Sequence, residues 1–183
     1  MKILAFAASN SKQSINKQLL QYATTLLSDV EIELLDINDY AMPIYGEDLE
    51  AECGIPAAAQ QFLDKIASAD ALIISYAEHN GGYAVAYKNL FDWTTRINQK
   101  VYQGKPIVML STSPGGAGAS NVLNMAVTSA EYFDGRVVSH FSLPSFYDNF
   151  DQEQGLITNL PLRQQYETAL ARVTETSNMA KSA

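Results

Sequence analysis

Short runs of apolar residues alternate along the chain with longer segments in which apolar and polar residues mix. Three runs, at residues 3–7, 71–76 and 107–110, are continuously apolar, which is typical of strands buried on both faces. Residues 30–36 alternate between apolar and polar positions, and residues 136–143 form a further strand candidate. The pattern therefore predicts five strands.

Between the strands, apolar residues recur at the spacing of an amphipathic helix. Residues 15–27 define a first helix, for which Ser14 is a suitable N-cap. A second helix surrounds residues 59–66, with Pro56 at its N1 position. Further helices are expected at residues 84–98, up to residue 133, and at residues 160–176, with a frayed tail after the last. Residues 37–55 lack periodicity, which predicts a long irregular connection.

The alternation of strands and helices indicates the α/β class. Parallel strands joined by right-handed helical crossovers form a sheet covered on both faces, so we expect three layers in a doubly wound arrangement. The chain has 183 residues, 47% of them hydrophobic, and no repeat or linker divides it. We therefore expect a single domain over residues 1–183.

Composition and charge narrow the function classes. The net charge is −8 and the Lys and Arg residues are scattered, so we expect no nucleic-acid partner. The sequence has no apolar stretch of membrane-spanning length and no signal-peptide pattern, and Cys53 is its single cysteine, which excludes an internal disulfide. Two histidines without acidic residues at ligand spacing predict no metal site. We expect a cytoplasmic protein without a membrane partner.

The first loop, residues 8–16, is rich in hydroxyl groups and joins a buried strand to a helix. Such a loop directs backbone N–H groups and the positive helix end at one spot, which suits a phosphate. Ser9, Ser11, Ser14 and Asn16 offer hydrogen-bond donors, and Lys12 offers a positive charge. An ordinary capped turn is the alternative interpretation. The glycine patterns of dinucleotide and triphosphate loops are absent, as is the serine nucleophile elbow.

Two more loops follow the third and fourth strands and meet the first at the carboxyl edge of the sheet. They contain Asn80-Gly81-Gly82 and Gly115-Gly116-Ala117-Gly118, whose small residues let the backbone approach a flat ligand. Each alone is also explained as a turn. Three such loops at one edge indicate a mononucleotide cofactor.

These loops carry motifs that resemble those of the flavodoxin-like NAD(P)H-dependent FMN reductases. The motifs are Ala8 to Asn16, Ser75 to Gly82 with Lys88-Asn89-Leu90-Phe91-Asp92-Trp93 downstream, and Ser113 to Gly118. They occur in the family's order and spacing, over residues 2–146. The resemblance implies a flavodoxin-like sheet with strand order 2-1-3-4-5.

The resemblance also implies FMN as the cofactor and assigns residues to it. It implies that the phosphate is bound by Ser9, Ser11, Lys12, Ser14, Ile15 and Asn16. It implies that the flavin ring is bordered by Ala77, Glu78, His79, Asn80, Gly81, Ser113, Pro114, Gly115, Gly116, Ala117 and Gly118. In relatives an Arg is usual at the position of Ser11, so Lys12 is the remaining cation. His79 replaces an aromatic residue, where it either stacks, senses pH or simply faces solvent.

The function implied is hydride transfer from NADPH or NADH to the flavin, followed by reduction of a quinone, azo, nitroaromatic, metal-oxyanion or flavin acceptor. FMN carries this chemistry, so we name no catalytic side chain, and we expect Glu78 to cap or shape its loop. A flavodoxin-type electron carrier and a scaffold that has lost FMN are the alternatives. Relatives pair through helices, so we expect a homodimer or homotetramer, with Leu90, Phe91 and Trp93 in the core or the interface and His140 in a structural role.

Overall fold

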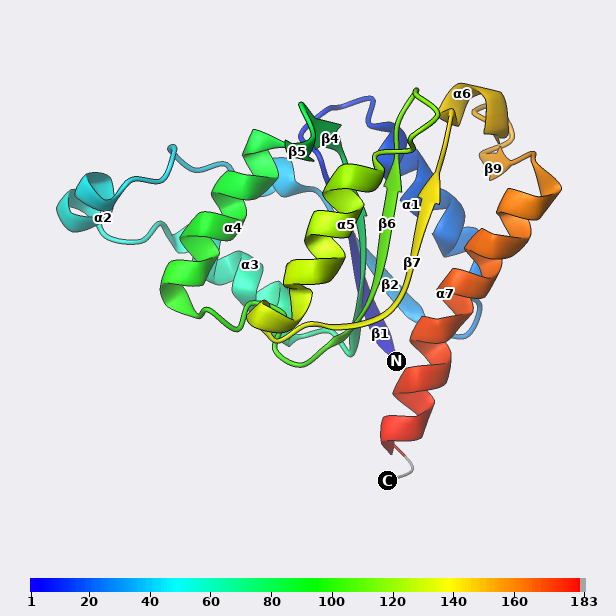
Figure 1. The fold of residues 1–183 in the computed structure, drawn as a ribbon. Helices are drawn as coiled ribbons and strands as arrows, with labels where there is room; N and C mark the ends of the chain where they lie inside the picture. Colours follow the sequence, from blue (N-terminus) through cyan, green and yellow to red (C-terminus); the bar gives the residue numbers. More distant parts are fainter. Residues whose placement is uncertain (182–183) are drawn as a thin grey trace.

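Five parallel strands form the central sheet of the computed structural model, which describes residues 1–181 (Figure 1). The strands are β1 (Lys2–Ala8), β2 (Glu31–Leu35), β3 (Ala71–Tyr76), β6 (Pro106–Thr112) and β7 (Arg136–Leu143). Their order is β2-β1-β3-β6-β7, and all four pairings are parallel. The five predicted strands and their predicted order, 2-1-3-4-5 when only these strands are counted, are confirmed.

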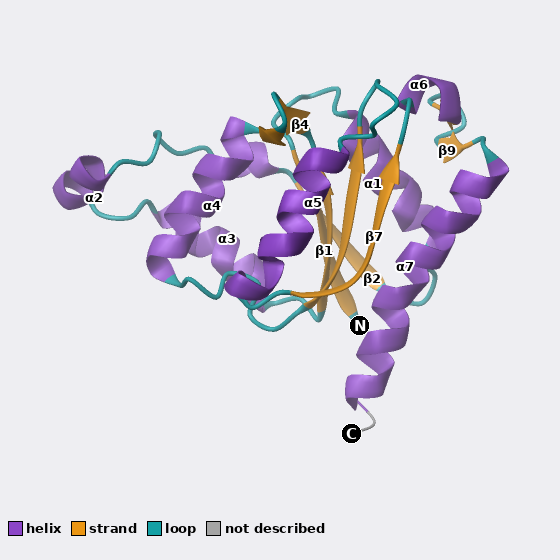
Figure 2. Cartoon of the chain, viewed as in Figure 1, coloured by secondary structure: helices purple, strands orange, loops and turns teal. Residues whose placement is uncertain are grey.

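Helices cover both faces of the sheet because neighbouring strand residues point to opposite sides. Leu4 and Phe6 of β1 pack against α3 (Ala57–Ala67), α4 (Val85–Ile97) and α5 (Ser120–Ser129). Ile3 and Ala5 pack against α1 (Ile15–Leu26) and α7 (Leu160–Lys181) on the other face. The three layers are visible in Figure 2. Burial on both faces explains why these strands have continuously apolar sequences.

The predicted helices are present, with small differences at their ends. The fourth ends as a 3-10 turn, η2 (Ala130–Phe133), and α7 continues beyond residue 176. The tail predicted to fray therefore lies partly within α7, and its last two residues lie outside the described chain. Pro56 occupies the N-cap rather than the predicted N1 position, with ψ 140°. Trp93, Phe91 and Leu90 are buried in the core, whereas His140 is exposed on β7, which corrects its expected structural role.

Residues 37–55 contain two helices that the sequence pattern missed. They are the 3-10 helix η1 (Ile37–Tyr40) and α2 (Glu47–Cys53). None of the residues of α2 is buried, so the helix has no apolar stripe for periodicity to reveal. In Figure 1, α2 lies at the far left, on the side of α4 that faces away from the sheet.

Short elements also shape two of the loops. β4 (Glu78–His79) and β5 (Gly82–Tyr83) form a hairpin in which Asn80 and Gly81 have φ values of 52° and 79°. Positive φ at both central residues is the geometry that an Asn-Gly pair favours in a two-residue hairpin. After β7 come α6 (Phe146–Asn149), β8 (Phe150–Asp151) and β9 (Leu156–Ile157). None of the described helices is long and apolar enough to cross a membrane.

Candidate functional site

The three predicted loops lie together at the carboxyl edge of the sheet. They follow β1, β3 and β6, three strands that are neighbours in the sheet, and appear at the top of Figure 1. Parallel strands end at the same edge, so loops distant in sequence meet there. Most of their surface is open: residues 10–13, 79–81 and 114–117 are exposed.

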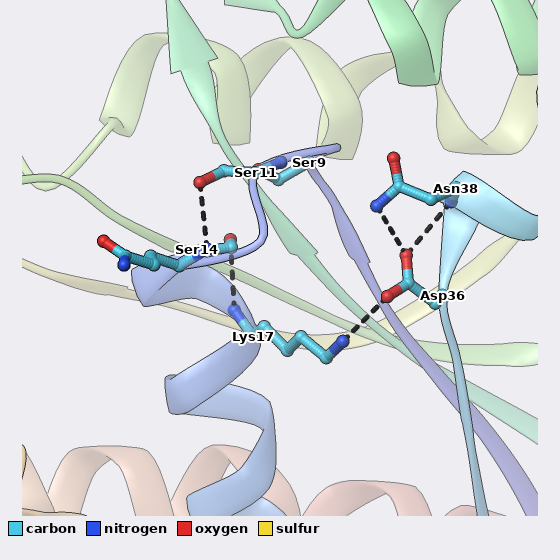
Figure 3. A network of polar contacts seen from close by, with 7 residues as sticks. Ser9, Ser11, Ser14, Lys17, Asp36 and Asn38 are labelled. Carbon is cyan, nitrogen blue, oxygen red and sulfur yellow. Dashed lines mark hydrogen bonds and ion pairs between the residues drawn. The ribbon is translucent and has the colours of Figure 1, made fainter.

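The hydroxyl groups of the first loop are oriented by its own backbone (Figure 3). The N–H groups of Ser11, Gln13 and Lys17 donate to the Oγ atoms of Ser9, Ser11 and Ser14, each at 3.3 Å. Each oxygen accepts this hydrogen bond through a lone pair, which leaves its own hydrogen free to donate elsewhere. Ser14 is also the N-cap of α1, as predicted, so its hydroxyl lies at the positive end of that helix. This arrangement suits an anion.

Two lysines near this loop have different environments. The Nζ atom of Lys17 lies 2.8 Å from Asp36 Oδ2, and Asn38 donates to Oδ1 of the same carboxylate (Figure 3). The hydrogen bond from Lys17, with that from the Asn38 backbone, lowers the pKa of Asp36. Among the residues that the structure describes, no ion pair includes Lys12, which lies exposed on the loop. Lys12 is therefore the cation available for an anion here.

Asn16, assigned above to the phosphate, uses its side chain inside the protein. It is 2% exposed, and its Oδ1 accepts from Ser75 Oγ at 2.8 Å and from Thr112 N at 3.2 Å. Its Nδ2 donates to Thr112 O at 3.3 Å. The amide thus joins the start of α1 to the ends of β3 and β6, beneath the loops. No local sequence pattern indicates this role, since the partners of Asn16 are distant along the chain.

The glycines of the third loop divide into two kinds. Gly118 has φ 61°, and a Cβ there would overlap the Ser142 hydroxyl and lie 3.0 Å from the Leu143 carbonyl. Its own carbonyl accepts from Ser111 Oγ at 2.7 Å and Ser142 Oγ at 2.8 Å. Packing and backbone geometry therefore explain Gly118. At Gly115 and Gly116, in contrast, φ lies outside the left-handed region and a Cβ would meet nothing nearer than 3.9 Å and 4.0 Å.

Within the described residues, neither packing nor backbone geometry requires glycine at positions 115 and 116. The exposed surface there nevertheless carries no side chain. Absence of Cβ atoms at an open surface lets a flat group approach the backbone. The loop is also held in place, because Ser145 N donates to Gly115 O at 2.9 Å and Phe146 N to Ser113 O at 3.0 Å. The sequence pattern did not predict that residues 145 and 146, which follow β7, support the glycine loop. The signal that could have indicated it is that this segment follows a strand ending at the same edge of the sheet.

Glu78 caps a helix, as expected. Its Oε2 accepts from the backbone N–H of Val122 at 2.9 Å and its Oε1 from Asn121 Nδ2 at 3.3 Å, at the start of α5. The N-cap residue Ala119 makes no side-chain cap of its own. Glu78 therefore fixes the β4–β5 hairpin to the helix that follows the glycine loop. The neighbouring His79 is exposed and lies at the edge of a cavity.

That cavity, of about 540 Å³, separates the hairpin from the segment after β2. A second cavity, of about 560 Å³, lies beside the first loop and is lined by Lys12, Ser14, Tyr147 and Gln152 among others. The described residues include no group of three or more His, Cys, Asp and Glu side chains that could hold a metal.

Fold and site together define a flavodoxin-like α/β protein with a ligand edge made of three loops. The chain belongs to the NADPH-dependent FMN reductase family, whose sequence profile matches residues 1–148. This confirms the family predicted from the loop motifs.

Curated relatives and a solved structure agree with this assignment. The chain is 36% identical over 121 residues to an NAD(P)H-dependent FMN reductase of Pseudomonas aeruginosa, covering 66% of this chain and 64% of that protein. It is 34% identical over 122 residues to a 2-hydroxy-1,4-benzoquinone reductase of a Burkholderia species, with coverages of 66% and 64%. The matches span slightly less than two thirds of these relatives. A flavoenzyme NAD(P)H:(acceptor) oxidoreductase of Paracoccus denitrificans superposes with a TM-score of 0.71 at 25% identity, covering 95% of this chain and 97% of that one.

The residues present fit FMN. Hydroxyl donors at a helix start and Lys12 match a phosphate. The open backbone at Gly115 and Gly116 matches a flat ring. Asn16 and Gly118, by contrast, have their polar groups engaged within the fold, so they support the site from beneath.

Proposed function

We propose that the protein is an FMN-containing oxidoreductase that uses NADPH or NADH to reduce a small organic or inorganic acceptor. The observation that carries this proposal is the pairing of a hydroxyl-lined loop at the start of α1 with an unobstructed Gly115–Gly116 backbone at the same edge. Family membership supports the proposal, as do relatives whose names describe FMN and quinone reduction.

When bound, FMN would accept a hydride from the reduced nicotinamide and supply electrons to the second substrate. The protein's share is binding and orientation. Ser9, Ser11, Ser14 and Lys12 would hold the phosphate, with the start of α1 at Ile15 adding backbone N–H groups. Ala77, Glu78, His79, Asn80 and Gly81 would border the ring on the hairpin side, and Ser113, Pro114, Gly115, Gly116 and Ala117 on the other. No side chain is required as a general acid or base.

An absorbance spectrum of the purified protein, recorded before and after incubation with FMN, tests the cofactor. We expect flavin bands, and a protein that remains colourless would favour a scaffold without FMN. Steady-state oxidation of NADH or NADPH in the presence of menadione, a quinone, tests the activity. Bound flavin without turnover of either nicotinamide would favour an electron carrier and refute the enzyme.

We further propose that quinone, azo, nitroaromatic, metal-oxyanion or flavin compounds are the acceptors, and that the protein acts in the cytoplasm as a homodimer or homotetramer. Val85, Met125 and Tyr132 support assembly, because they are 69%, 44% and 70% exposed on the α4, α5 and η2 surface. Light scattering should give at least twice the 20.0 kDa mass of the chain. A monomer at micromolar concentration would contradict the assembly.

A further inference from the structure

Residues 41–55 form an arm that leaves the sheet after η1, carries α2 and returns to α3 (Figure 2). Since α2 buries no residue, the arm has little hydrophobic core of its own. Its position must therefore come from contacts that it makes with α4.

The side chain of Asn89 on α4 fastens the first part of the arm. Its Oδ1 accepts from Tyr45 N at 2.8 Å, and its Nδ2 donates to Met42 O at 3.1 Å and Pro43 O at 3.0 Å. Both donor hydrogens and one acceptor lone pair of the amide are thus used on three backbone groups of the arm. One turn further along, Trp93 Nε1 also donates to Pro43 O, at 2.8 Å.

A second set of contacts holds α2 from the outside. Arg96 Nε lies 2.9 Å from Glu50 Oε2, and Tyr45 Oη donates to the same oxygen at 3.1 Å. The Arg96 and Glu50 side chains are 49% and 21% exposed, so solvent weakens their ion pair. We therefore ascribe the position of residues 42–45 chiefly to Asn89 and Trp93.

The fastened segment forms one wall of the 540 Å³ cavity. Met42 and Ile44 of the arm lie across from His79 and Asn80 of the hairpin, and Asn10 of the first loop joins the lining. Aspartate, glutamate, lysine and arginine are absent from the lining, although the chain carries a net charge of −8. Carboxamides and apolar side chains without a fixed charge suit an uncharged ring bearing carbonyl groups.

We propose that Asn89 is a positioning residue that sets this wall and thereby the affinity for an uncharged, carbonyl-bearing acceptor. The proposal rests on the proposed function. Asn89 itself belongs to the cavity lining, but its polar atoms are bonded to the backbone of Met42, Pro43 and Tyr45, so it acts through that backbone. FMN phosphate binding, which falls to the first loop, should be independent of it.

The test compares two variants with the wild type and a matched control. Asn89→Ala removes all three bonds, whereas Asn89→Asp keeps an acceptor for Tyr45 N but faces two carbonyl oxygens with a carboxylate. Asn98→Ala is the control, because Asn98 is the C-cap of the same helix and, among the described residues, its side chain bonds only the N–H of Lys100, two positions on, at 2.9 Å. For each protein, menadione KM and kcat, FMN affinity and thermal stability are measured.

We expect the menadione KM to rise about fivefold or more in both Asn89 variants, as the loss of about 1 kcal/mol of positioning predicts, with kcat and FMN affinity within twofold. Asn98→Ala should match the wild type. A protease specific for acidic residues should also cut the arm faster in the Asn89 variants, at Glu47, Asp48, Glu50 or Glu52.

Two results would overturn this proposal while leaving the proposed function intact. An unchanged KM in both variants of an active enzyme would show that the arm does not shape the acceptor site. A parallel loss of kcat, acceptor affinity, FMN affinity and thermal stability would show a purely structural role. A wild type that reduces no menadione with either nicotinamide would instead refute the proposed function and this proposal with it, so the two failures are distinguishable.

Discussion

Asn16 and Thr112, 96 positions apart in the sequence, exchange two hydrogen bonds. The Asn16 amide donates to the Thr112 carbonyl at 3.3 Å, and the Thr112 N–H donates back to Asn16 Oδ1 at 3.2 Å. This buried pair connects the first residues of α1 with the last residue of β6. It therefore fixes the phosphate loop relative to the glycine loop, which follows Thr112 directly.

Replacing Asn16 should destabilise the protein more than it directly affects a ligand. Asn16→Ala leaves the buried Ser75 hydroxyl and Thr112 N–H without this partner, which should lower the free energy of unfolding by about 2–3 kcal/mol. Urea unfolding measures this difference, and Asn10→Ala, at an exposed position of the same loop, is the control. A change below about 0.5 kcal/mol would contradict the structural role.

Gly116→Ala and Gly118→Ala should affect different properties, the first FMN affinity and the second folding stability. The first has space for its Cβ and should fold with wild-type stability while binding FMN less tightly, because the methyl group would occupy the open surface. The second meets Ser142 and Leu143 with a positive φ, and should lose about 2 kcal/mol or more of folding free energy. Thermal melts and flavin titrations separate the two effects. Wild-type FMN affinity in Gly116→Ala would place the ring elsewhere.

Ser14 combines two roles that substitution can separate. Ser14→Ala removes both the helix cap and a phosphate donor, so we expect weaker FMN binding and a loss of about 1 kcal/mol of stability. Ser14→Asp keeps a capping oxygen but adds a negative charge, so it should fold normally and bind FMN even less tightly. If flavin titrations of Ser14→Asp match those of the wild type, the phosphate does not lie at this loop.

Glu78, in the β4–β5 hairpin, should stabilise the protein by capping the start of α5. Glu78→Ala removes the acceptor for Val122 N and should cost about 1 kcal/mol of stability, whereas Glu78→Gln retains an oxygen there and should cost less. Chemical denaturation of both variants tests this order. Equal stability of the alanine variant and the wild type would exclude the cap as a stabilising contact.

Acid should weaken the edge of the sheet through Glu33 on β2. Hydrogen bonds from Lys2, at 2.8 Å, and Lys65, at 2.5 Å, lower the Glu33 pKa from its ordinary value of 4.5. Because the folded pKa is the lower one, the stabilisation is complete above pH 4.5 and is lost as the pH falls through the folded pKa. Glu33→Gln should therefore be less stable than the wild type by up to about 1 kcal/mol at neutral pH.

Unfolding measured from pH 7 downward checks the sign. The difference between the wild type and Glu33→Gln should shrink below pH 4.5. A difference that grew on acidification would show that the pKa of Glu33 is raised in the folded protein.

Sequence pattern was sufficient for the sheet and its covering helices because burial imposes a strict spacing of apolar residues. The same reasoning missed α2, whose residues are all outside the core. It also missed α6, which lasts only four residues and leaves too few positions for a period to show.

The candidate site was predictable to the level of its loops but not of its individual side chains. Asn80-Gly81 indicated the turn of the hairpin, and Ser14 indicated a cap, since both are local effects. The engagement of Asn16 with Thr112, and of Asn89 with the arm, depends on partners brought together by the fold. No local pattern distinguishes these amides from solvent-facing ones.

Trp93 is the only tryptophan of the chain and is completely buried, with its ring edge-on to Tyr45 at 5.0 Å between centroids. Its indole N–H is bonded to Pro43 of the arm. Emission excited at tryptophan wavelengths therefore arises from one ring beneath the arm. The molecule carries an intrinsic optical reporter of whether residues 42–45 are seated or released, readable without a label and in real time.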